Sequence, residues 1–288
     1  MLDDTVRVAP VRAADLPEVG AFLHDHLNPR LSAADWAAAA VPTWQVDAPN
    51  HGFLLRAGDR LVGVQLAFYA EREVEGRTVR FCNLGAWCVL EPYRGHGLRL
   101  LRAALAQRGH VFTDLSPSGS VVAINERLRF RSLDTTTALV PNLPRLPGRR
   151  RARVVTDLDE IDRALDGAER ALFRDHRRAG AAHHVLLDAG PRGRCYVMYR
   201  SDRRRGMRLF ATLLHVSDPD VLRRCRPDLA RHLLARRLPV TLAELRVVGG
   251  RPAGSVLLRH PRPKQVRGTE VSPDAVDNLY SELVLVAW

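Results

Sequence analysis

The 288-residue chain contains almost no lysine, few aromatic residues and no long apolar run. No apolar stretch reaches the roughly 18–20 residues that a membrane-spanning helix needs. The N-terminal MLDDTVRVAP carries acids early and lacks the apolar segment of a signal peptide. We therefore expect a cytoplasmic globular protein with no membrane partner, since its 46% hydrophobic content suits a packed core.

Cysteine is also scarce. Cys82, Cys88, Cys195 and Cys225 form no C-x-x-C pair, and no histidine lies at metal-ligand spacing from them. Zinc sites and the disulfide frameworks of small secreted domains both require such spacing. We therefore expect four reduced and mostly buried thiols, and no metal.

Positive charge is abundant and comes almost entirely from arginine. The formal net charge is +12, and Lys264 is the only lysine among 44 basic residues. A positive field attracts nucleic acid, and it equally attracts polyanionic small molecules such as nucleotides or coenzyme A. The arginine runs at 149–153 and 203–205 have few aromatic residues between them, so they offer little for base stacking. We therefore disfavour nucleic acid as the partner.

The first half of the chain alternates between strand-like and helix-like segments. Residues 13–27 carry apolar side chains at helical spacing, and Ser32 is placed to cap a second helix that runs to Ala40. Three apolar runs between residues 52 and 90 are separated by short turns and predict an antiparallel meander. The other expected elements are strands at 5–12, 110–116 and 133–140 and helices at 98–107 and 120–130.

The second half repeats part of this order. After a region rich in proline and arginine, we expect a helix at 156–178 with Thr156 as a candidate cap. A helix at 218–237 follows two strands on either side of an arginine-rich turn, and further strands are expected at 240–249, 252–260 and 280–288. The repeated order predicts two related domains, 1–143 and 154–288, joined by a linker at 144–153.

A glycine turn joins a strand to a helix at 91–101, EPYRGHGLRLL. Such a turn presents backbone N–H groups and a helix N-terminus to an anion. Residues 89–99 resemble the coenzyme A loop of the GCN5-related N-acetyltransferase family, whose signature is Arg or Gln, two residues, Gly, one residue, and Gly or Ala. Arg94 and Gly97 match this signature, and Arg99 takes the last position.

The resemblance extends over residues 5–140. Further along, INERLRFRSLD resembles the helix-to-strand passage of the family, with Phe130 in place and Arg129 where a glycine is common. The resemblance implies an α+β fold, a mixed and mainly antiparallel sheet flanked by helices, followed by a degenerate second domain of the same kind. It also implies direct transfer of an acyl group, most simply from acetyl-CoA, to the amine of a small molecule. A homodimer is left open.

The resemblance places the co-substrate on the glycine loop and on the strand before it. The loop amides and two arginines would hold the pyrophosphate, and the two glycines would permit the close approach and the unusual dihedral angles that this needs. Amides near the strand end are candidates for supporting the oxyanion. We interpret Cys88 as packing rather than as a nucleophile. The residues expected to bind acetyl-CoA, or another acyl-CoA, are Trp87, Cys88, Val89, Arg94, Gly95, His96, Gly97, Leu98, Arg99 and Asn125.

Three residues are candidates for the catalytic roles. Many members of the family carry a tyrosine five residues before the phenylalanine, placed to protonate the leaving thiolate. Asn125 stands there, and its amide can hydrogen-bond a sulfur but is no acid. Asp114 is a candidate base where the sheet should open, or else a turn residue. Glu73 alternates with two further glutamates on one strand face, as a candidate base or as part of an exposed hairpin.

Two other functions remain open. An acyl-CoA-binding regulatory or structural protein of the same fold is favoured by Asn125 and Arg99, which depart from the family pattern. An RNA-associated basic protein would use the arginine runs. In the C-terminal strand expected at 280–288, alternation puts Tyr280 and Glu282 on one face, and we interpret their role as structural.

Overall fold

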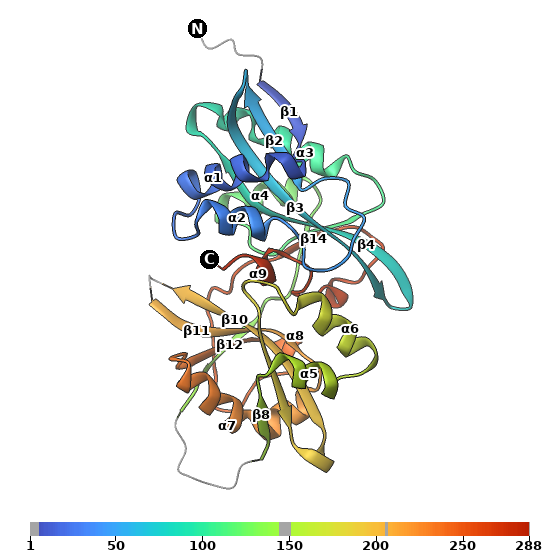
Figure 1. Cartoon of the computed structure of the whole chain (residues 1–288), viewed down its shortest axis with the longest axis vertical. Helices are drawn as coiled ribbons and strands as arrows, with labels where there is room; N and C mark the ends of the chain where they lie inside the picture. Colours follow the sequence, from blue (N-terminus) through green and yellow to red (C-terminus); the bar gives the residue numbers. More distant parts are fainter. Residues whose placement is uncertain (1–5, 144–150, 205–206, 288) are drawn as a thin grey trace.

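The computed structural model describes residues 6–143, 151–204 and 207–287, which form two sheets (Figure 1). Each sheet has seven strands, runs mainly antiparallel and is flanked by helices, which confirms the predicted mixed α/β class and a second lobe of similar architecture. Most of the predicted linker, Arg205 in the arginine-rich turn and Trp288 lie outside the described residues. No helix in the described ranges is both long enough and apolar enough to cross a bilayer.

The first sheet has the strand order β1-β2-β3-β4-β5-β14-β6. Its strands β2, β3 and β4 are antiparallel neighbours, which confirms the predicted meander, whereas β5 runs parallel to β4. The strand bounds are β1 (Val6–Pro10), β2 (Gly52–Ala57), β3 (Arg60–Val74), β4 (Arg77–Val89), β5 (Val111–Asp114), β14 (Gln265–Arg267) and β6 (Arg131–Ser132).

Helices cover both faces of this sheet. Alternation along β3 sends Leu66 and Phe68 into one apolar cluster with the first two helices, and Ala67 and Tyr69 into another with the third. Ser32 caps α2 as predicted, because its hydroxyl accepts the Asp35 N–H at 3.1 Å. The helices are η1 (Ala13–Asp15), α1 (Leu16–His26), α2 (Ala33–Ala39), η2 (Glu91–His96), α3 (Gly97–Leu105) and α4 (Gly119–Arg127).

The second sheet has the strand order β13-β7-β12-β11-β10-β9-β8. Its strands are β7 (Thr137–Pro141), β8 (Arg153–Val155), β9 (His183–Asp188), β10 (Arg194–Arg204), β11 (Met207–Val216), β12 (Val240–Glu244) and β13 (Val256–Leu257). The helices of this half are α5 (Leu158–Ala164), α6 (Gly167–His176), η3 (Gly190–Arg192), α7 (Pro219–Ala235), α8 (Leu245–Val248), η4 (Pro273–Ala275) and α9 (Glu282–Leu285).

The two sheets exchange a strand. The closing strand predicted at 133–140 was expected in the first sheet, but β7 pairs with β12 and β13 of the second. In return, β14 from the C-terminal half lies between β5 and β6 of the first sheet. β14 satisfies the backbone hydrogen-bonding groups on the outer edge of β5. β6, which is only two residues long, pairs with the other edge of β14.

The helix predicted at 156–178 is divided into α5 and α6. The backbone is extended at Leu165, and Gly167 has a positive φ of 49°, so the chain turns between the two helices. The cap of α5 is Asp157 rather than Thr156, because the Asp157 carboxylate accepts the Glu160 N–H at 2.8 Å. The sequence prediction also missed β8 and β9.

The strand predicted at 280–288 is wrong. Ser281 caps the short helix α9 by accepting the Leu283 N–H at 3.2 Å, and residues 281–286 are all buried. Since both faces of the segment are covered, its alternating apolar pattern does not report a half-buried strand. The predictions at 240–249 and 252–260 were too long, because β12 gives way to α8 and β13 has two residues.

Helix α9 lies between the two sheets (Figure 1). From the first sheet, Asn83 accepts the backbone N–H of Glu282 at 3.1 Å. From the second, the guanidinium of Arg200 donates to the carbonyl of Leu283 at 2.8 Å and to that of Val286 at 3.3 Å. Bonds to both sheets therefore fix the position of the Glu282 side chain.

Candidate active site

The strands β4 and β5 separate partway along the first sheet. Residues 81–83 of β4 pair with residues 111–113 of β5, and no pair follows. A bulge lies just beyond, because Ala86 and Trp87 of β4 together oppose the single residue Gln65 of β3. Ala86 has a positive φ of 47°, and such a bulge bends the strand and increases its twist. The sheet therefore opens where Asp114 ends β5.

A cavity of about 470 Å³ occupies this opening, and its size falls within the range of small-molecule sites. Apolar residues of β4 and α4 form part of its wall, and polar groups come from four separate segments of the chain. The polar lining residues are Gln65, Trp87, Asp114, Ser116, Ser118 and Arg262. Its wall therefore combines strand, loop and C-terminal residues around one space.

Two polar groups of the lining have no hydrogen-bond partner among the described residues. They are the indole Nε1 of Trp87, a donor, and the side-chain carbonyl of Gln65, an acceptor, and both atoms are buried. Buried polar groups in native proteins are nearly always paired, so each such exception needs an explanation. A ligand that carries both an acceptor and a donor would satisfy the two groups.

Asp114 is held in the site by Asn125. The Asn125 amide nitrogen donates to Asp114 Oδ2 at 2.9 Å and to the side-chain oxygen of Gln265 at 3.0 Å. These two bonds use both of its amide protons. Asn125 is therefore a positioning residue here and has no proton left for a thiolate sulfur, contrary to the role expected from the sequence.

Burial raises the pKa of Asp114 to about 6, despite the hydrogen bonds from Asn125 and from the Ser116 backbone N–H. Gln265, which holds Asn125 from the other side, belongs to β14, so the exchanged strand supports the site directly. The predicted position of Asp114, where the sheet opens, agrees with the structure.

Glu282 is a second carboxyl group at the site, and the sequence analysis assigned it no functional role. Ser116, which lines the cavity, donates its hydroxyl to Glu282 Oε1 at 2.7 Å. Burial and the nearby Asp114 charge raise the pKa of Glu282 to about 7, while Oε2 has no partner among the described groups. The signal in the sequence was a glutamate within the apolar run SELVLV, since a glutamate is seldom fully buried without a partner.

The glycine loop lies at the end of β4, where η2 leads into α3. Gly97 has φ −55°, and its N–H donates to the Arg94 carbonyl. Gly95 is likewise outside the positive-φ region. The prediction that these glycines supply unusual dihedral angles is therefore wrong, and the Gly97 amide is already bonded inside the turn.

The loop backbone is exposed at Gly95 and buried at Gly97. A Cβ atom added at Gly95 would meet no atom within 4 Å, and one at Gly97 would make ordinary 3.5 Å contacts with Trp87 and Val89. Packing of the protein itself therefore does not require glycine at either position. No side chain caps the N-terminus of α3. Because glycine has no side chain, both positions leave room for a ligand that approaches the loop.

The arginines of the loop differ in their environment. Arg94 is exposed and lies 3.8 Å from Glu91, which leaves its side chain accessible. Arg99 donates to the carbonyl of Val6 at 2.9 Å and contacts His96 at 3.4 Å, so it ties α3 to β1. A phosphate contact stays a prediction for both arginines, since Arg99 is exposed and keeps further N–H donors.

Other predicted residues lie near the loop or away from the cavity. Burial raises the pKa of the Cys88 thiol, which contacts the carbonyl of His26 at 3.5 Å, so it is protonated at neutral pH and serves as packing. Leu98 packs in the apolar cluster under α3. Glu73 is exposed near the tip of the β3–β4 hairpin, where it accepts a hydrogen bond from Thr78. The structure does not bring Glu73 to the cavity.

Comparisons with known proteins support the fold. No family model and no curated protein matches the sequence. A GCN5-related N-acetyltransferase from Anabaena variabilis matches with a TM-score of 0.60 and 10% identity, over 91% of this chain and 72% of the other. One from Kribbella flavida matches with a TM-score of 0.59 and 14% identity, over 92% and 71% of the two chains.

The yeast Saccharomyces cerevisiae N-myristoyltransferase with bound myristoyl-CoA matches with a TM-score of 0.50 and 12% identity, over 98% of this chain and 85% of the other. All three alignments include most of the C-terminal half, since each covers more than nine tenths of the chain. The chain therefore has the fold of the GCN5-related N-acetyltransferases, as the glycine loop and its surroundings predicted.

Proposed function

We propose that the protein is an acyl-CoA-dependent acyltransferase, which transfers an acetyl or other acyl group to the amine of a small molecule. One observation carries this proposal. The cavity at the opening between β4 and β5 contains Asp114 and Ser116, and through Ser116 it is linked to the buried carboxyl group of Glu282. Trp87 lines this cavity and also lies next to Gly97 of the glycine loop.

The co-substrate is assigned to the loop and the end of β4. The exposed backbone at Gly95 and the uncapped start of α3 suit its phosphates. The unpaired Nε1 of Trp87, which lies close to the Gly97 position, supplies a donor for a carbonyl oxygen. Arg94 adds a positive side chain at the rim.

The acceptor amine must lose a proton as it attacks the thioester carbonyl carbon. A C–N bond forms, the C–S bond breaks and the thiolate leaves. Asp114, with its pKa raised to about 6, is mostly ionised at neutral pH and accepts the proton of the amine. Ser116 links the cavity to Glu282, whose pKa of about 7 suits it to accept a proton through the serine hydroxyl.

Calorimetric titration with acetyl-CoA tests where the co-substrate binds. Gly97→Glu adds bulk and negative charge to the loop at a helical φ that any residue adopts. Because Gly97 is buried, the thermal transition of the variant is measured first to show that it folds. We expect the wild type to bind and the variant to lose at least about tenfold in affinity. Ala171→Glu, which adds the same charge to exposed α6, is the matched control and should bind normally. Equal binding by Gly97→Glu would contradict the assignment.

Thiol release in the presence of small-molecule amines then tests catalysis. An amine that accelerates release, together with mass detection of the acylated product, would support acyl transfer. Binding without turnover for any amine would instead favour the acyl-CoA-binding regulatory protein. That alternative draws on one observation, the full use of Asn125 as a positioning residue, which leaves no proton donor at the position that the family fills with tyrosine.

A further inference from the structure

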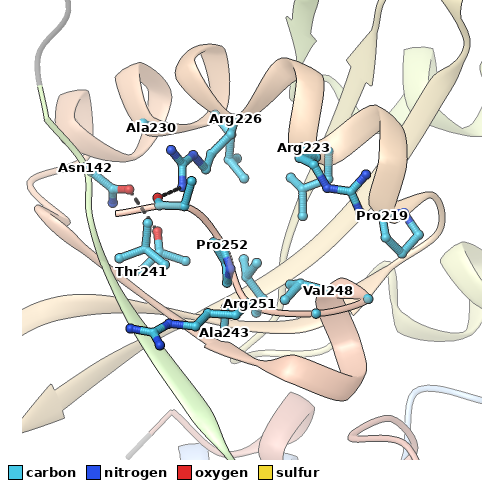
Figure 2. Close-up of a pocket in the computed structure, with 17 residues that line it drawn as sticks. Asn142, Pro219, Arg223, Arg226, Ala230, Thr241, Ala243, Val248, Arg251 and Pro252 are labelled. Atoms are coloured by element: carbon cyan, nitrogen blue, oxygen red, sulfur yellow. Dashed lines mark hydrogen bonds between the residues drawn. The ribbon is translucent and has the colours of Figure 1, made fainter. Parts of the chain in front are cut away.

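The second lobe contains a separate cavity of about 300 Å³ (Figure 2). Its walls are α7, the neighbouring strands and the loop 249–253 after α8. It shares no lining residue with the cavity at the opening between β4 and β5, the proposed acyl-transfer cavity. We propose that this cavity binds an amphipathic anion, a small molecule with an apolar body and one carboxylate or phosphate head. The proposal is independent of the function proposed above.

The floor of the cavity is apolar. Leu213 of β11, Leu222 and Leu229 of α7, Ala243 of β12 and Val248 of α8 all line it, and all five are buried. These side chains come from four elements that pack in one apolar cluster, so the surface is preformed. It can take up a hydrocarbon group by removing apolar surface from water.

The polar groups of the floor are already satisfied. Thr241 donates to the side-chain oxygen of Asn142 at 2.9 Å, a bond drawn in Figure 2. The amide of Asn142 donates to the carbonyl of Leu238 at 2.8 Å. Neither residue therefore requires a polar partner from a ligand, which again favours an apolar body.

The rim is cationic. Arg226 on α7 donates to the carbonyl of Ala253 across the cavity at 2.6 Å (Figure 2). Arg251 donates to the carbonyl of Ser255 at 3.0 Å. A guanidinium has five N–H groups, so each arginine is held in place and keeps further donors. Within the described ranges no carboxylate pairs with either, whereas Arg223 is paired with Asp220 at 2.5 Å. Two arginines without acidic partners above an apolar floor match a carboxylate or phosphate head.

The start of α7 does not supply the anion site. The Asp218 carboxylate caps it by accepting the N–H groups of Asp220 and Val221 at 2.9 and 2.8 Å, and it would repel a phosphate. The cavity is therefore no second coenzyme A loop. At ~30 Å³ for each water-sized group, 300 Å³ admits about ten non-hydrogen atoms. An eight-carbon chain with a small head has this size.

Calorimetric titration of the full chain with sodium octanoate, octyl phosphate and octan-1-ol tests the proposal. We expect both anions to bind and the neutral alcohol to bind at least about tenfold more weakly. A preference between the two anions would distinguish a carboxylate source from a phosphate source. Comparable binding of octan-1-ol and octanoate would overturn the proposal, as would an absence of anion binding at millimolar concentration.

Variants locate the site. Arg226→Gln combined with Arg251→Gln should weaken binding of the anions about tenfold or more and leave octan-1-ol unchanged, because only the head loses its partners. Ala230→Phe should fill the cavity, since Ala230 lines it. Arg178→Gln replaces an exposed arginine of the same lobe as control and should bind octanoate like the wild type.

Gly97→Glu separates this site from the first lobe. Octanoate binding should survive that substitution, and coenzyme A should not displace octanoate from the wild type. Loss of octanoate binding in Gly97→Glu would assign the ligand to the acyl-transfer cavity and overturn the proposal. Unchanged octanoate affinity in the double arginine variant would also overturn the proposal. The thermal transition of this variant shows whether it is folded.

Discussion

Ser116 joins two carboxyl groups that burial makes weakly acidic. Its backbone N–H faces Asp114 at 3.4 Å, and its hydroxyl donates to Glu282 at 2.7 Å. Burial raises the pKa of both groups, to about 6 and about 7, so near neutral pH the pair changes charge. Because the groups interact, the observed proton losses belong to the pair rather than to either residue.

The activity of the proposed enzyme should follow this titration. We expect kcat/KM for an amine acceptor to rise between about pH 6 and pH 7 as the pair loses protons. Asp114→Asn removes the proposed general base, so kcat should fall roughly 10²–10⁴-fold. The measurement is a pH–rate profile of both proteins. A variant with the wild-type rate and profile would show that Asp114 is not the base.

Stability should respond to pH through Glu282. Its folded pKa, about 7, lies above the ordinary glutamate value of 4.5, so the folded state binds the proton more tightly. Stability is then retained below about pH 4.5 and falls as pH rises towards 7. Glu282→Gln stays neutral, so urea unfolding at pH 8 should show it more stable than the wild type, by up to about 3 kcal/mol.

The same comparison at pH 4 should show little difference, since the wild-type carboxyl is then protonated. Glu73→Gln is the control, because Glu73 is exposed and its substitution should change neither curve. A Glu282→Gln variant that is less stable than the wild type at pH 8 would contradict the burial argument.

At the scale of elements, the backbone just after α4 takes a left-handed conformation that suits glycine, but the residue there carries a long side chain. Arg129 follows the helix with φ 66°, and the Phe130 N–H turns back to the Asn125 carbonyl at 3.0 Å. A left-handed backbone costs a side-chain-bearing residue roughly 1–2 kcal/mol. Arg129→Gly should therefore raise the free energy of unfolding by about 1 kcal/mol in urea titration.

Arg127→Gly is the matched control for this element. Arg127 is exposed and is the last residue of α4, where the backbone is helical, so glycine there should destabilise by roughly 0.5–1 kcal/mol. Opposite signs for the two arginine-to-glycine changes would establish that backbone conformation is the cause. Equal signs would contradict it.

Local elements could be predicted from sequence where short-range chemistry decides them. Ser32 with Asp35 forms both halves of a capping box, and the turns of the meander separate long β-prone runs. The last apolar segment could not be predicted in this way. Its alternation suits a strand, but contacts with Asn83 and Arg200 from both sheets determine its helical turn, and these lie 83 to 199 positions away.

The site was predictable to the same extent. Asp114 and the loop at 94–97 follow from the order of strand, turn and helix around them. Glu282 and Gln265 reach the site only through the exchanged C-terminal segment, 166 positions from Ser116 and 140 from Asn125. No pattern in one sequence reports such distant contacts. The prediction of unusual dihedral angles at Gly95 and Gly97 was wrong for a different reason, since glycine also occurs where space rather than a special backbone conformation is needed.

At the scale of the molecule, the exchanged strands couple the two lobes. β7 completes the second sheet and β14 the first, and Arg72 of β3 forms an ion pair with Asp277 of the C-terminal segment. We expect the full chain to unfold in a single calorimetric transition. Two separated transitions would show that the lobes are independent.

A fragment that ends at residue 143 should fail to fold alone, because the outer edge of β5 and the amide of Asn125 lose their partners in β14. Co-expression with the fragment 144–288 should restore soluble protein, measured by co-purification. A soluble, cooperatively folded 1–143 fragment would show that the sequence-based boundary marks an autonomous domain.

The insertion of β14 also sets an order in time. Ser116 is synthesised 166 residues before Glu282, and chains grow at roughly 5–20 residues per second. For on the order of ten seconds, each nascent chain therefore carries its glycine loop and Asp114 without the strand and helix that finish the site. A ribosome that stops before residue 265 releases a product without β14 and α9, so the chemistry proposed for this chain becomes available only once both elements have been made.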